Sequence, residues 1–101
     1  MKFMSFTMFD VAKAAEVAAA GDTVSNTPGR KVLAQYLCEA IPFPGVPPNT
    51  IVVVAITEAE SNEAISAAMY PVMLAGATVH MVPVLEMPVG GAAETEKQYR
   101  A

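Results

Sequence analysis

The single histidine, His80, is the side chain of this sequence best suited to proton transfer near neutral pH. It lies within Thr78–Glu86, where alternating residues predict a strand, so its ring should point to one side of a sheet. Ser5 and Thr7 have no base next to them in the sequence, and neither a serine-centred nucleophile elbow nor a phosphate-binding glycine loop is present. His80 is therefore the candidate catalytic residue. A histidine that only packs in an apolar face with one hydrogen bond is the alternative.

Four further side chains are candidates for binding a ligand. Tyrosine has a polar hydroxyl on an apolar ring, and methionine fills irregular apolar spaces. The candidate ligand-binding residues are Tyr36, Tyr70, Met69 and Met73. Together with His80, they could line a cleft for an apolar or aromatic small molecule. The same side chains could instead only fill a core or a subunit interface.

Metal and cofactor sites are not indicated. Cys38 is the only cysteine, so neither an intramolecular disulfide nor a cysteine-based metal site can form. Glu39, Glu58 and Glu60 are spaced like solvated strand ends rather than metal ligands. Apart from His80, nothing in the sequence indicates haem. We expect no metal and no cofactor.

Composition excludes some partners and suggests another. A net charge of −4, with Arg30-Lys31 as the only adjacent basic pair, argues against nucleic-acid binding. No apolar run approaches the roughly 20 residues of a membrane span, and no targeting segment is recognisable, so we expect a cytoplasmic protein. Hydrophobic residues make up 53% of the chain and charged residues only 16%. This apolar surplus suggests a subunit interface.

The run Thr50–Thr57 anchors the architecture, because its β-branched residues predict a strand. Both faces of this strand are apolar, so both must be covered. The segment Lys2–Phe9 also alternates as a strand with two largely apolar faces. Asp10 is placed to cap a helix over Val11–Ala20, which Gly21 could end.

The middle of the chain is ambiguous. Arg30–Ala40 fits both a helical stripe and strand alternation. We favour the strand, because Thr27-Pro28-Gly29 reads as a turn and the proline-rich segment 41–49 forms a loop.

A second helix and a last strand follow. Ser61 should cap a helix over Asn62–Ala75 that Gly76 closes, and Pro71 should kink or interrupt this helix. Thr78–Glu86 should form the last strand, and Pro83 suggests that it lies at a sheet edge.

The resulting order is βαββαβ, a ferredoxin-like split βαβ of the α+β class. It predicts a four-stranded antiparallel sheet with both helices on one face and with the first and third strands in the centre. We expect one domain over residues 1–87 and a polar C-terminal tail over 88–101.

Four pieces of the sequence carry a resemblance to a known superfamily. They are the opening Lys2-Phe3-Met4, the lead-in Pro28–Leu33, the exit Ile56–Glu60 and the closing Val82–Glu86. Together they resemble small dimeric α+β-barrel proteins of the ferredoxin-like class, over roughly residues 1–87. The resemblance implies that two sheets pair face to face in a homodimer or a higher even oligomer, which would cover the second apolar face.

Function stays open at this point. The superfamily includes cofactor-independent oxygenases, lactone isomerases, haem enzymes and members without an assigned activity. One hypothesis is a small enzyme or carrier with a cleft between sheet and helices. The other is a non-catalytic structural or regulatory dimerisation module.

Overall fold

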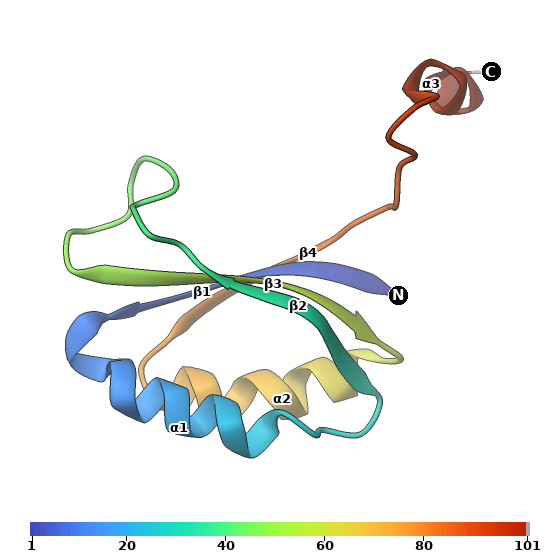
Figure 1. Cartoon of the computed structure of the whole chain (residues 1–101). Helices are drawn as coiled ribbons and strands as arrows, with labels where there is room; N and C mark the ends of the chain where they lie inside the picture. The colour runs from blue at the N-terminus through green and yellow to red at the C-terminus, as the bar shows by residue number, and fades with distance from the viewer. Residues whose placement is uncertain (101) are drawn as a thin grey trace.

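The chain forms four strands packed with helices in a computed structural model that describes residues 1–100 (Figure 1). Ala101, the last residue of the expected polar tail, lies outside the described residues. The elements are β1 (Lys2–Asp10), the 3-10 turn η1 (Val11–Lys13), α1 (Ala14–Val24), β2 (Arg30–Leu37), β3 (Thr50–Ala59), α2 (Asn62–Leu74), β4 (Thr78–Pro83) and α3 (Ala92–Arg100).

The four strands form one antiparallel sheet in the order β2-β3-β1-β4. The central strands β1 and β3 pair over their whole length, from Lys2 opposite Glu58 to Asp10 opposite Thr50. Helices α1 and α2 lie side by side beneath one face of the sheet, which we call the helix face (Figure 1). We call the other side of the sheet the open face, because no helix within residues 1–100 covers it (Figure 1). The predicted ferredoxin-like α+β fold is confirmed.

The ambiguous segment is a strand, as predicted. β2 pairs with β3 from Arg30 opposite Ala59 to Leu37 opposite Val53. An irregularity between Val32 and Ala34 shifts the register by one residue. Side chains after this bulge therefore point to the face opposite to the one that simple alternation from Val32 would give.

Both predicted N-caps are confirmed. The Asp10 carboxylate accepts a hydrogen bond from the Ala12 amide at 2.8 Å, and the Ser61 hydroxyl accepts one from the Ala64 amide at 3.1 Å. Each cap satisfies an amide that has no partner within its own helix.

Two details of the helices differ from the sequence prediction. The first helix continues through Gly21 to Val24, so Gly21 does not end it. Val24 is buried in the core, and its packing stabilises the extra turn. The second helix runs through Pro71 without interruption, and Gly76, with φ of 117°, follows its end as predicted.

The end of the chain leaves the sheet earlier than expected. β4 ends at Pro83, which lacks an amide donor and sits on the edge strand, as predicted. The polar tail contains the helix α3, which stands apart from the sheet (Figure 1). Ion pairs Glu94–Lys97 and Glu96–Arg100, each about one turn apart, support this helix.

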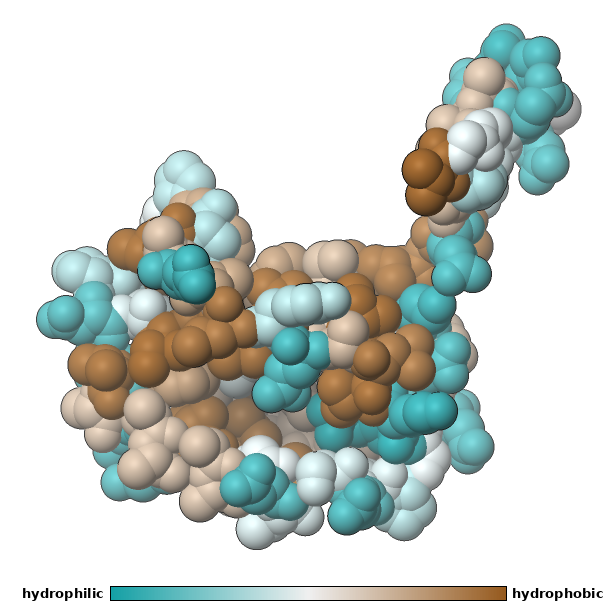
Figure 2. Space-filling model, viewed as in Figure 1, coloured by the Kyte–Doolittle hydropathy of each residue, from teal (hydrophilic) through white to brown (hydrophobic). Residues whose placement is uncertain are grey.

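The core lies between the two helices and the helix face. Its buried side chains include Phe9, Val17, Ala68, Met69 and Val72. In the space-filling view, apolar side chains follow the near edge of the sheet above a hollow (Figure 2). No helix within residues 1–100 has the length and apolar character needed to cross a membrane.

Candidate functional site: a cavity between helix α1 and the sheet

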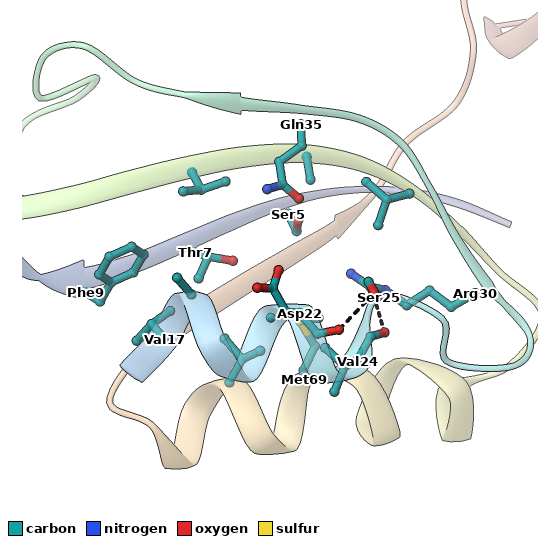
Figure 3. A pocket seen from close by; sticks show the side chains of 16 residues that line it. Ser5, Thr7, Phe9, Val17, Asp22, Val24, Ser25, Arg30, Gln35 and Met69 are labelled. Carbon is teal, nitrogen blue, oxygen red and sulfur yellow. Dashed lines mark hydrogen bonds between the residues drawn. The ribbon is translucent and has the colours of Figure 1, made fainter. Parts of the chain in front are cut away.

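A cavity of about 410 Å³ lies between α1 and the helix face of the sheet. Figure 3 shows the side chains that line it, which come from β1, β2, β3, α1 and α2. A space therefore exists between the sheet and the helices, where the sequence led us to expect one.

Small side chains explain why this space is not filled. On the helix face, Ser5 and Thr7 of β1 stand beside Ala55 and Val53 of β3. Across the cavity from them, the lining residues of α1 include Ala18 and Gly21, which add little volume. Because small side chains face each other at these positions, the space between them is left unfilled.

The walls of the cavity are mainly apolar. They hold seven large or branched side chains: Phe9, Val17, Val24, Val32, Val53, Met69 and Val72. Burying an apolar group against such walls is favourable, by roughly 25 cal/mol for each Å² removed from water. The cavity therefore suits a ligand with an apolar body.

Most polar groups of the lining lie in two places, and Gln35 of β2 lines the cavity as well. Ser5 and Thr7 lie on the sheet, and Figure 3 shows the Asp22 carboxylate projecting from α1 towards them. At the other place, Ser25 and Arg30 line the cavity near the end of α1 and the start of β2. Such a sparse set of polar groups in an apolar space is typical of sites that orient a small molecule.

The hydrogen bonds at the Arg30 end are backbone contacts. Arg30 Nη1 donates to the carbonyl of Val24 at 3.4 Å, and the Ser25 hydroxyl donates to the carbonyl of Asp22 at 2.9 Å (Figure 3). Within residues 1–100, Arg30 Nε is buried without a hydrogen-bond partner. Burial of the guanidinium lowers the pKa of Arg30 below its usual value because the charged form loses solvation.

Only one of the predicted site residues lines this cavity. Met69 of α2 does so, and it is almost fully buried. Tyr70 and Met73 are on the same helix, but their side chains are 60% and 45% exposed and lie outside the lining. The structure does not bring these five residues together around one cleft, because they are divided between the two sides of the sheet.

Tyr36 and His80 lie on the open face. Tyr36 pairs with Val54, and His80 pairs with Phe6, whereas Ser5 and Val53 point to the helix face. The bulge in β2 turns Tyr36 away from the helices. The sheet thus separates both side chains from the cavity.

His80 borders a second hollow on its own side of the sheet. This space of about 480 Å³ lies between the proline-rich loop and the ends of β1 and β4, and its lining includes Phe43, Asp10 and Thr78. Phe43 of the loop meets Phe6 of β1 edge to face, with ring centroids 5.9 Å apart. The proposed catalytic role of His80 stays a prediction.

Arg30, Asp22, Ser5 and Thr7 were not predicted from the sequence as cavity residues. A signal for the last two was present, because they share strand parity with Phe3 and Phe9 and interrupt an apolar face. Arg30 and Asp22 carried no local signal, since only the turn that joins α1 to β2 brings them to the same cavity. In the described part of the chain, no group of three histidine, cysteine or carboxylate side chains is arranged to hold a metal ion.

Two solved structures share this ferredoxin-like α+β fold. The C-terminal domain of the MgtC protein from Mycobacterium tuberculosis aligns with a TM-score of 0.60 and 10% identity, over 80% of this chain and 84% of that one. A proposed antibiotic biosynthesis monooxygenase from Deinococcus radiodurans aligns with a TM-score of 0.53 and 11% identity, over 90% of this chain and 100% of that one. No protein-family model and no curated protein matches the sequence. At such identities the likeness shows the fold alone.

Proposed function

We propose that this protein binds a small, mainly apolar organic molecule in the cavity between α1 and the sheet. The observation that carries the proposal is the cavity itself, about 410 Å³ in volume, with apolar walls and a few polar groups. Ligand sites in proteins commonly have volumes of about 300–1,000 Å³ and this kind of lining.

The sheet residues that face α1 support a ligand-binding site rather than a loosely packed core. Ser5 is buried on the floor of the cavity, where an apolar side chain would pack against the helix more favourably. Ala55, next to it, is also buried and leaves the same space open. A pure scaffold would gain stability from larger apolar residues at both positions.

A titration followed by NMR tests this proposal. The neutral probe 2-naphthamide has an aromatic body that matches the apolar walls. Its addition should shift the amide signals of Ser5, Asp22 and Ala55, and leave those of Tyr36 and His80 unchanged. Shifts confined to the open face, or no shifts at millimolar probe, would contradict the proposed site.

The variant Ala55→Leu provides the matched control. Its longer side chain projects from the cavity floor into the empty space. The variant should keep the fold and lose probe binding. If it binds 2-naphthamide as well as the original protein does, the probe occupies another place. The name of the Deinococcus neighbour suggests oxygenation as one reaction to assay on any ligand that co-purifies.

We also propose that the protein forms a homodimer through its open face. This face presents Met4, Phe6, Met8, Val54 and Ile56, which are only half-buried, and the exposed Val82. An apolar patch of this kind is uncommon on a soluble monomer. Burying each such side chain contributes roughly 1.5–3 kcal/mol, so several on both subunits can exceed the entropic cost of association.

Sedimentation at micromolar concentration tests the dimer. The original protein should sediment at about twice its chain mass of 10.6 kDa. The variant Val54→Lys places a charge in the middle of the open face and should sediment as a folded monomer. Val89→Lys, made at a fully exposed position after β4, is the matched control and should remain dimeric. A monomeric original protein would overturn this proposal.

A further inference from the structure

Arg30 is the strongest unassigned binding group of the molecule. It begins β2 on the helix face, where it pairs with Ala59, and its guanidinium lines the cavity. Its neighbour Lys31 pairs with Glu58 and points to the open face. Of the two adjacent basic residues, only Arg30 therefore brings a positive charge to the cavity.

The guanidinium is held in place but is not neutralised. Its one intramolecular hydrogen bond goes to the Val24 carbonyl at the end of α1, where the helix dipole favours a cation. Among residues 1–100, no carboxylate lies within ion-pair distance of Arg30. Nε is buried and has no partner there. A guanidinium has five N–H donors, so most of its capacity is unused.

The arrangement suits one kind of anion. Arginine binds carboxylates through two parallel hydrogen bonds, which gives both affinity and orientation. The Asp22 carboxylate also projects into the cavity (Figure 3), and it would repel a second negative charge on the ligand. The other polar side chains of the lining are neutral, and the rest of the walls is apolar. The lining thus selects against dianions and against strongly polar molecules.

We propose that the ligand of this cavity is an apolar or aromatic monocarboxylic acid whose carboxylate is bound by Arg30. This inference rests on the proposed function, because it names the chemical class that the same cavity takes. The apolar body of the ligand lies against Val17, Val53 and Met69. Its carboxylate faces the junction of α1 and β2, where Arg30 lines the cavity.

Two probes of equal shape separate charge from size. The carboxylate 2-naphthoate and the neutral amide 2-naphthamide share one ring system. The original protein should bind 2-naphthoate about tenfold or more tightly than 2-naphthamide, as expected for a charge-assisted pair. In Arg30→Gln, binding of 2-naphthoate should weaken to the level of 2-naphthamide, and 2-naphthamide should bind as before.

Two control variants complete the experiment. Lys31→Gln removes the same charge one residue away, on the open face, and should leave both affinities unchanged. Arg30→Lys keeps the charge without the planar fork, so its affinity for 2-naphthoate should be intermediate. If Arg30→Gln does not fold, the ratio of the two affinities in the original protein and in Arg30→Lys decides the matter.

The outcomes distinguish the two proposals. If 2-naphthamide binds in the cavity and 2-naphthoate binds no more tightly, the carboxylate assignment is wrong and the proposed function stands. A preference for 2-naphthoate that survives in Arg30→Gln also overturns the assignment. If neither probe binds the original protein at millimolar concentration, the proposed function fails and the assignment fails with it.

Discussion

The two faces of the sheet differ in how their apolar residues are used. On the helix face, Ser5, Thr7 and Ala55 are small, and two helices cover them, so that a cavity remains in a covered region. On the open face, Phe6 and Val54 are larger, and no helix in the described chain covers them. The helix face is covered by helices, but its side chains are too small to fill the space. The open face carries larger side chains, but no helix within residues 1–100 covers it.

This difference suggests that the faces have separate roles. A cavity with mainly apolar walls can hold a small molecule, whereas an uncovered apolar sheet is suited to another sheet. The proline-rich loop shields only one end of the open face, where Phe43 packs on Phe6 and Val52 is buried. The remaining apolar side chains would need a second subunit to leave water.

The largest effect on stability should come from truncating a methionine in the core, and truncating one on the open face provides the comparison. Met69→Ala removes a side chain buried between α2 and the sheet and should lower the free energy of unfolding by about 2–5 kcal/mol. Met4→Ala, on the half-buried open face, should lower it by less in dilute protein. Urea unfolding of both variants at several protein concentrations provides the measurement.

Protein concentration sharpens this test. Mass action makes the stability of a dimer rise with concentration, so the loss in Met4→Ala should depend on concentration if Met4 lies in an interface. The loss in Met69→Ala should not depend on it to the same degree. Equal behaviour of both variants at all concentrations would show that the open face stays free.

A pair of alanine-to-leucine substitutions should give the next largest effect, within the helix face. Ala68 of α2 is completely buried and borders no cavity, so Ala68→Leu should destabilise by about 1–3 kcal/mol through overpacking. Ala55→Leu enters the empty space and should be neutral or stabilising. Thermal unfolding of both variants measures the difference. Equal destabilisation would mean that the space above Ala55 is closed in solution.

The fold could be predicted because its signals are local. Strand alternation, the caps Asp10 and Ser61, and the turn at Pro28-Gly29 each act within a few residues. Those signals determine the order of elements, and the order determines the sheet. The ends of elements were less predictable: burial of Val24 extends α1 beyond Gly21, which is a tertiary effect.

The site could not be predicted because it depends on register and volume. The bulge after Val32 decides that Tyr36 faces away from the helices, and no residue type marks it. The face to which His80 points is set by the register of β4 against β1, and the sequence does not determine this register. The cavity arises from small residues on three separate elements, so only the assembled structure brings Ser5, Ala18 and Ala55 together.

The smallest effect should come from the ion pair between Lys2 and Glu86, which lies at the margin of the open face. The two side chains are 3.0 Å apart and are 28% and 84% exposed. In a monomer, such a pair should contribute no more than about 1 kcal/mol, and salt should weaken it further. The exposed pair Glu94–Lys97 on α3, away from the sheet, is the control.

If a second subunit covers the open face, water is excluded around Lys2 and the Lys2–Glu86 pair becomes stronger. A double-mutant cycle with Lys2→Met and Glu86→Gln should then give a coupling energy that grows with protein concentration, while the coupling on α3 stays constant. A Lys2–Glu86 coupling as small as the control at every concentration would place this margin outside any interface.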